Sequence, residues 1–283
     1  MPEKRDITLY WILRIACVMC YVGHGAFGVI TKEGWLPYFA VVGIPAEYAW
    51  MLMPVVGIVD ILLGISVLFR PTRAGLIYMV IWSTWTALLR PLAGQGASEF
   101  LERAGNYGIP LALLFISYTG HQVQGWFAKV EPQRITEQLG QRLIRIVRLS
   151  ACALLVGHGA FGAITGKAML MDHFASVGIG SGAPDAAGLL QLIGLGEMVL
   201  GGAMLFTTAP GLLWAAFGWK VFTELLYPIS GDSFFEFVER GGSYAAPLAL
   251  LVLFAIGKQR GWHIPRVGTH LMRTSQLSPA AGD

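Results

Sequence analysis

Long apolar segments, interrupted by short polar or proline-containing breaks, run through most of the chain. A helix that spans a membrane needs about 20 predominantly apolar residues, and eight segments approach that length. We therefore expect membrane-spanning helices at residues 7–30, 48–69, 74–92, 104–124, 144–165, 186–206, 210–228 and 241–257. Pro91 and Pro228 should end or kink helices, because proline lacks the N–H that the helical hydrogen-bond ladder requires.

The sequence also contains an internal duplication. Residues 23–28 (GHGAFG) recur unchanged at residues 157–162, and residues 99–114 match residues 236–251 at 11 of 16 positions. Both halves therefore derive from one unit of about 135 residues. Because each unit holds four predicted helices, both units enter the membrane in the same direction, which predicts a parallel repeat.

These patterns predict an all-α, polytopic membrane protein. Its eight transmembrane helices would form two parallel-repeat four-helix bundles related by pseudo-twofold symmetry. The first repeat is expected at residues 1–125 and the second at residues 144–258. A cytoplasmic linker at residues 126–143 would join them, and residues 259–283 are expected to form a flexible C-terminal tail.

Composition agrees with a location in the lipid bilayer. Of the 283 residues, 55% are hydrophobic and 13% are charged, about half the roughly 25% charged residues of a soluble domain. Too few polar groups remain to cover a surface exposed to water. This balance excludes an ordinary soluble enzyme, a disordered chain, a coiled coil and collagen, and no nucleic-acid partner is expected.

Basic residues are distributed unevenly between the two sides of the predicted bundles. Fourteen of the 20 Lys and Arg residues fall on the side that holds both chain ends, and six fall on the other side or at its helix ends. Cytoplasmic loops of membrane proteins carry the excess of Lys and Arg. Both termini are therefore expected in the cytoplasm, and the protein in an inner or cytoplasmic membrane.

Two histidines occupy equivalent places in the duplicated glycine motif. His24 and His158 fall late in the first helix of each half, and the glycines on both sides of each ring permit close approach of a helix or a cofactor. If the first helices meet at the symmetry axis, the two rings could bind one haem iron or flank a quinone head. Alternatively, each imidazole bonds a backbone carbonyl within its own bundle. No metal site other than this possible haem iron is indicated.

Asp60 and Glu197 occupy equivalent places in the second helices. Each has a glycine three residues before it and another four residues after it, so acid and glycines share one helical face. A carboxylate in such a tight helix contact is either paired or protonated, and Arg14 and Arg148 are the expected partners. A structural ion pair and a proton-relay role both remain open.

The third helices break the likeness between the halves. Lys220 and Glu224 lie one turn apart and can neutralise each other, whereas the first half has Ser83 and Ala87 there. The difference indicates either that the halves have specialised or that the second has a local stabilising pair. Arg90 could bind an anionic or carbonyl-bearing ligand, or extend its charged end to the lipid headgroups.

Two further pairs favour structural roles. The Glu102–Arg103 and Glu239–Arg240 pairs lie at the start of the fourth helices, where an acidic residue is stabilised by the helix dipole. They could also form the rim of an outward-facing site.

Cys17 and Cys20 form a C-x-x-C within the first helix. Apolar surroundings keep thiols protonated, so we expect this pair to pack rather than to perform redox chemistry.

Two sequence blocks in each half carry a family resemblance. An early helix ends in glycines and a lysine (GHGAFGVITK and GHGAFGAITGK), and a later helix has an acid before a run of small residues (VVGIVDILLG and LIGLGEMVLGG). In these features each half resembles the DoxX-like family of four-helix membrane proteins. The resemblance implies a tandem four-helix fold and a role like that of the small membrane subunits of quinone-linked oxidoreductases. The chain departs from the family in its duplication and in the histidines of the glycine motif.

Three functions are compatible with these features. The first is an integral membrane subunit of a redox system, with quinone or haem near the outer leaflet and other membrane subunits as partners; its binding residues would be His24, His158 and Arg90. The second is a proton-coupled small-solute transporter, whose pathway would use Asp60, Glu197, Lys220 and Glu224. The third is an accessory or scaffold subunit of a larger membrane complex. The first is favoured, and no catalytic residue is assigned.

Overall fold

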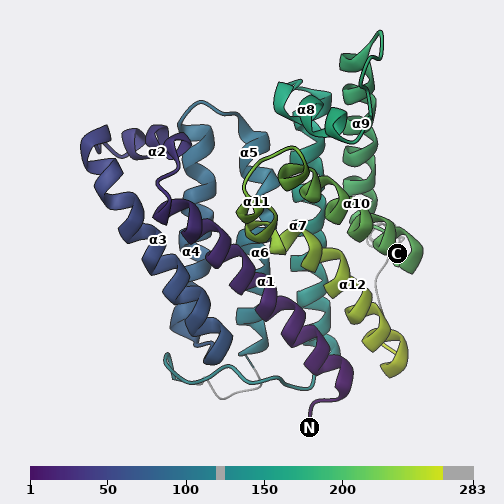
Figure 1. Ribbon diagram of the computed structural model, residues 1–283. Coiled ribbons are helices and arrows are strands. Elements are labelled where there is room, and N and C mark those ends of the chain that lie inside the picture. The colour runs from purple at the N-terminus through teal and green to yellow at the C-terminus, as the bar shows by residue number, and fades with distance from the viewer. Residues whose placement is uncertain (119–124, 264–283) are drawn as a thin grey trace, which may run out of the picture.

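A computed structural model describes residues 1–118 and 125–263 of the chain. Apart from one isolated bridge, every regular element in these ranges is a helix (Figure 1). The elements are α1 (Lys4–Val29), η1 (Glu33–Trp35), α2 (Leu36–Val41), α3 (Ala46–Phe69), α4 (Arg73–Leu92), α5 (Ala97–Glu102), α6 (Ala104–Ile116), α7 (Glu137–Ala163), α8 (Ala168–Ser176), α9 (Ala186–Met204), α10 (Pro210–Ile229), α11 (Phe234–Glu239) and α12 (Gly241–Arg260).

A helix lies at each of the eight predicted ranges, with two differences at the ends. The prediction for the fourth range extended to residue 124, and residues 119–124 lie outside the described part of the chain, as does most of the predicted tail, at 264–283. The second difference is that α7 begins at Glu137 rather than at residue 144, because the Thr136 side chain caps it by accepting a hydrogen bond from the Leu139 N–H. The predicted linker is thus partly helical.

Five helices are long and apolar enough to cross a membrane, which is typical of an integral membrane protein. They are Lys4–Val29, Ala46–Phe69, Glu137–Ala163, Ala186–Met204 and Phe234–Arg260. The outermost two, α3 and α9, expose apolar side chains along most of their length: Met51 is 71% exposed and Val199 is 73% exposed. Such faces suit contact with lipid rather than with water.

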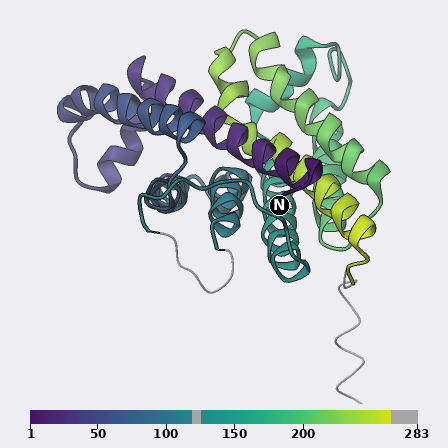
Figure 2. The ribbon, with the colours of Figure 1, turned by 90° about the horizontal axis from the view of Figure 1, so that it is seen from below.

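Four helices form the centre of the molecule. Helix α1 packs against α12 and α6, and α7 packs against the same two helices from the other side. Helices α3 and α4 flank this centre on one side, and α9 and α10 flank it on the other (Figures 1 and 2). The N-terminal end of α1 and the C-terminal end of α12 are adjacent, because Arg260 bonds both carboxylate oxygens of Asp6.

Glycines allow the closest helix contacts. A Cβ atom on Gly57 of α3 would lie 2.4 Å from the carbonyl oxygen of Gly25 in α1. The same distance separates a Cβ on Gly194 of α9 from the carbonyl oxygen of Gly159 in α7. Helix backbones that touch in this way require residues without side chains. The predicted glycine faces around Asp60 and Glu197 are therefore confirmed as helix contacts.

Candidate ligand-binding cavity and buried ion pairs

A cavity of about 260 Å³ lies in the first half of the chain, enclosed by α1, α2, α3 and α4, with α6 and α11 completing its wall. Its lining is mainly aromatic and aliphatic, with a few polar groups. The lining residues are Cys20, Tyr21, His24, Trp35, Tyr38, Phe39, Val42, Ile44, Leu52, Val56, Trp82, Ser83, Trp85, Thr86, Leu89, Arg90, Arg103, Asn106 and Glu239. Apolar walls with a small number of polar groups are characteristic of small-molecule sites.

His24 is held in the cavity wall by two contacts. Its Nδ1 lies 2.8 Å from Asp60 Oδ2, and its ring stacks on Trp35 with 4.6 Å between the ring centres. The Asp60 side chain is buried, whereas the His24 side chain keeps 19% of its surface exposed. The carboxylate thus orients the imidazole while the ring stays accessible to a ligand in the cavity.

Arg90 approaches the cavity from the end of α4. One guanidinium nitrogen donates to the Tyr38 hydroxyl at 2.8 Å and lies 3.6 Å from the Glu99 carboxylate. The Tyr38 hydroxyl in turn donates to Gln95. The Trp82 Nε1 atom and Asp60 Oδ1 are also buried without a hydrogen-bond partner among the described side chains. One hydrogen-bond donor and one acceptor thus remain unused in this region.

The corresponding region of the second half is filled by charged side chains. His158 Nδ1 lies 2.7 Å from Glu197 Oε2, as in the first half, but the His158 side chain is only 2% exposed. Lys220, where the first half has Ser83, contacts Glu224 at 2.7 Å and Glu197 at 3.5 Å. The predicted neutralisation of Lys220 by Glu224 is confirmed.

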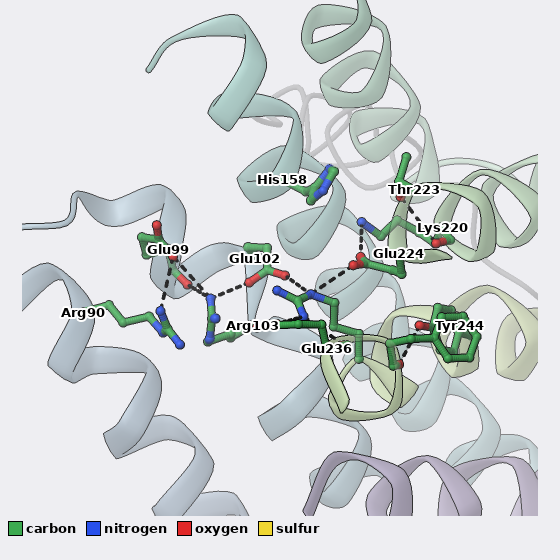
Figure 3. Close-up of polar contacts among 12 residues, drawn as sticks. Arg90, Glu99, Glu102, Arg103, His158, Lys220, Thr223, Glu224, Glu236 and Tyr244 are labelled. Carbon is green, nitrogen blue, oxygen red and sulfur yellow. Dashed lines mark hydrogen bonds and ion pairs between the residues drawn. The ribbon is translucent and has the colours of Figure 1, made fainter. Parts of the chain in front are cut away.

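A continuous run of ion pairs connects the two regions (Figure 3). From the cavity, Glu99 bridges Arg90 and Arg103, and Arg103 contacts Glu102 at 2.5 Å. Glu102 then lies 3.4 Å from Arg240 of the second half. Beyond this point the run continues through three acid–base contacts, namely Arg240–Glu224 at 2.9 Å, Glu224–Lys220 and Lys220–Glu197.

Glu102 is the link between the halves and stays charged. Burial by itself would raise its pKa, but the positive charges of Arg103, Arg240 and Lys220 outweigh that effect and hold the pKa of Glu102 well below its usual value. Lys32 and Lys167 strengthen the same junction, because each reaches the opposite half: Lys32 bonds Glu236 at 2.5 Å and Lys167 bonds Glu99.

The structure brings some predicted site residues together and separates others. His24 and Arg90 share the cavity, whereas His158 lies against Glu197 in the other half. The central helix contact is made by Gly105 of α6 and Gly242 of α12, so the condition for a shared haem, that the first helices meet at the axis, is not met. Asp60 is separate from the cluster of Glu197, Lys220 and Glu224.

The prediction that Arg14 and Arg148 pair with the buried acids Asp60 and Glu197 was wrong. Arg14 donates to the backbone carbonyls of Val67 and Leu68, and Arg148 donates to the carbonyl of Thr207. The reason is depth: α1 and α3 are antiparallel, so Arg14 is level with the last turn of α3, where carbonyl groups lack helical partners. The expectation that each histidine bonds a carbonyl was wrong as well, because carboxylates occupy that place.

Sequence reasoning missed several residues of the cavity wall. Trp35, Tyr38 and Phe39 follow the first glycine motif as an aromatic stretch, a signal that could have indicated a ring-binding wall. Glu239 was considered only as part of a possible rim; its place in the cavity of the first half was not predicted, since it comes from the second half of the chain. Cys20 also lines the cavity, and Cys17 and Cys20 are buried free thiols.

Comparison with known protein families, curated proteins and solved structures finds no match. The fold of the described residues is that of a helical integral membrane protein with an aromatic cavity beside a buried ionic network. Among the residues with described positions, no cluster of three or more His, Cys, Asp or Glu side chains has the geometry of a metal site.

Proposed function

We propose that this protein is a membrane subunit of a quinone-linked redox system and that a quinone head binds in the cavity. The aromatic cavity with the His24–Asp60 pair in its wall is the observation that carries the proposal. A quinone head is a flat ring with an oxygen at each end. Trp35, Tyr38 and Trp85 supply ring surfaces for it, and His24 and Arg90 supply hydrogen bonds to oxygen.

The size of the cavity favours one ring over a macrocycle. Its volume of about 260 Å³ lies just below the roughly 300–1,000 Å³ of sites for drug-sized ligands. A substituted six-membered ring fits such a space, and haem does not. The separate positions of His24 and His158 point the same way, because bis-histidine ligation needs both imidazoles on one iron.

We further propose that the chain crosses the membrane eight times as two parallel repeats. Equivalent contacts in the two halves support this arrangement. Each histidine pairs with an acid, and Lys32 and Lys167 each bond a glutamate of the opposite half. Gly105 of one half contacts Gly242 of the other. Both chain ends would lie in the cytoplasm, as the excess of basic residues on that side indicates. The cavity would then open near the outer leaflet.

Proton-coupled transport receives less support. The ion-pair run contains Arg103 and Arg240, and a guanidinium group does not release its proton in proteins. The ion-pair run therefore interrupts proton transfer, and a role in holding the two halves together fits it better than a role as a proton pathway. A purely scaffolding role would not account for the polar side chains, such as His24 and Arg90, that line the cavity.

A matched pair of substitutions in α3 tests the quinone proposal. Val56 lines the cavity, while its neighbour Val55 is 56% exposed on the outer face of the helix. We expect Val56→Phe to fill the cavity and weaken binding of decylubiquinone by about tenfold or more, because the ring no longer fits. Val55→Phe should bind like the wild type. Quenching of tryptophan fluorescence in detergent measures the affinity.

Extraction of the purified protein supplies an independent readout. Wild type and Val55→Phe should carry quinone through purification, and Val56→Phe and His24→Ala should carry less. If the wild type neither retains quinone nor binds decylubiquinone, the proposed function is wrong. Equal binding by both valine variants would place the ligand outside the cavity.

A further inference from the structure

The Glu239 side chain contributes a carboxylate to the cavity wall. The residue is 5% exposed and forms part of the cavity wall. No hydrogen bond or ion pair joins its carboxylate to another side chain within residues 1–118 and 125–263. Arg103 and Arg90 act on this carboxylate through their charge but donate no hydrogen bond to it, so its oxygens remain available to a hydrogen-bond donor on a ligand.

The equivalent residue of the other half shows that this condition is specific to Glu239. Glu102 occupies the same place at the end of α5 and is paired with Arg103 at 2.5 Å and with Arg240 at 3.4 Å. Two residues of the same type, at the ends of equivalent short helices, thus differ in one respect. Glu102 is committed to the ion-pair run, whereas Glu239 faces the cavity.

The backbone of Glu239 is held firmly against α1. A Cβ atom on Gly23 would lie 2.3 Å from the Glu239 backbone nitrogen, so α11 and α1 touch with no side chain between them. Gly23 directly precedes His24 in the chain. The backbones of His24 and Glu239 therefore lie close together, and both side chains line the same cavity.

The cations of the same wall have partners already. Arg103 contacts both Glu99 and Glu102, and Arg90 donates to Tyr38 and approaches Glu99. Glu239 is therefore an acceptor in the cavity wall that remains available to a ligand. An oxidised quinone offers only carbonyl oxygens, which accept hydrogen bonds, whereas a quinol offers hydroxyl groups, which donate them.

We propose that the cavity selects the reduced, dihydroxy form of the ring and that Glu239 accepts a hydrogen bond from one of its hydroxyl groups. The inference rests on the proposed function, since it names the form of the ligand at the same site. The site then uses both halves of the chain. The quinol ring lies among residues of the first half, and Glu239, which distinguishes the reduced from the oxidised form, comes from the second half.

Binding of decylubiquinol and decylubiquinone, measured anaerobically with the full-length protein in detergent, tests this selectivity. The wild type should bind decylubiquinol about tenfold or more tightly than decylubiquinone, because the quinol hydroxyl donates to the carboxylate whereas the quinone carbonyl meets a second acceptor there. The midpoint potential of the bound couple should rise by about 30 mV for each tenfold preference, since two electrons are transferred.

Glu239→Gln should abolish the preference, because the amide N–H donates to the quinone carbonyl while the single amide oxygen is a weaker acceptor for the quinol hydroxyl. Glu239→Asp should restore part of it, and Glu47→Gln, an exposed site on α3, should change neither affinity. Equal affinities of the wild type for the two forms, or an unchanged preference in Glu239→Gln, would overturn the inference while leaving quinone binding intact. Absence of binding to both forms would instead indicate failure of the proposed function.

Discussion

The two histidine–acid pairs show how the same residues acquire different properties from their surroundings. The His24–Asp60 and His158–Glu197 pairs have nearly equal lengths, 2.8 and 2.7 Å. The difference lies beside them: Lys220 contacts Glu197, and no described cation contacts Asp60. The first pair borders a cavity, whereas the second is part of a closed ionic cluster.

This difference predicts unequal effects of neutralising the two acids. Glu197→Gln leaves both Lys220 and His158 buried with weaker partners, and we expect a loss of about 3–5 kcal/mol in the free energy of unfolding. Asp60→Asn leaves a partly exposed His24, and about 1–3 kcal/mol should be lost. Unfolding of the two variants in the same detergent measures both values, and equal losses would contradict the assignment of Glu197 to a charged cluster.

A second prediction at the residue scale concerns pH and Glu102. Its pKa in the folded protein is lowered by the neighbouring cations, so its stabilising contribution is present above the unfolded pKa of about 4.3. That contribution is lost as the pH falls through the lower, folded pKa. The stability difference between wild type and Glu102→Gln should therefore be constant from about pH 8 to 5 and shrink below about pH 4. A difference that disappears between pH 7 and 6 would exclude a lowered pKa.

At the scale of the elements, glycine position decides how closely two helices approach. Gly194 and Gly196 lie two residues apart in α9 and face opposite surroundings. A Cβ on Gly194 would meet the backbone of α7, whereas a Cβ on Gly196 would meet no atom within 4 Å. Gly194 therefore permits the α7–α9 contact, whereas a side chain at position 196 would contact no described atom.

Alanine substitutions at these two glycines should therefore have opposite signs. Gly194→Ala forces α9 away from α7, and we expect a loss of about 1–3 kcal/mol in the free energy of unfolding. Gly196→Ala should be neutral or stabilise by up to about 1 kcal/mol, because alanine favours the helix. Thermal unfolding in detergent compares them, and a destabilised Gly196→Ala would show that the outer face of α9 has a partner.

At the scale of the whole molecule, the two halves are joined by charge and by backbone contact. Glu102 and Arg240 connect the halves within the ion-pair run, and Gly105 of α6 touches Gly242 of α12. Removal of one partner from a buried run leaves an uncompensated charge. The halves therefore depend on each other, and the cavity needs both because Glu239 completes its wall.

Labelling of single cysteines tests the proposed orientation of the whole chain. Glu33 precedes α2 and Glu131 lies in the linker, and both residues are exposed. In a background without the native cysteines, Glu33→Cys should react with a membrane-impermeant thiol reagent in intact cells. Glu131→Cys should react only after permeabilisation. Reaction of both positions from outside would exclude an arrangement with both chain ends in the cytoplasm.

Much of the fold could be predicted from local patterns. The apolar segments located the eight main helices, and the glycine spacing around Asp60 and Glu197 located two helix contacts. The short helices α5 and α11 were not predicted, because a six-residue helix leaves little periodic signal. The partners of Arg14 and Arg148 were missed because sequence spacing does not reveal which residues lie at the same depth in antiparallel helices.

The sequence by itself determined the class of protein, its main helices and the residues that carry charge within apolar segments. These properties depend on composition and short-range periodicity, which are local. Only the tertiary structure decided that the cavity lies in the first half and that Lys220 and Glu224 fill its counterpart. It also decided that Glu239 is presented to the cavity while Glu102 is paired. Such differences arise from packing between segments that are distant in the chain. They cannot be predicted from two sequence blocks that are nearly identical.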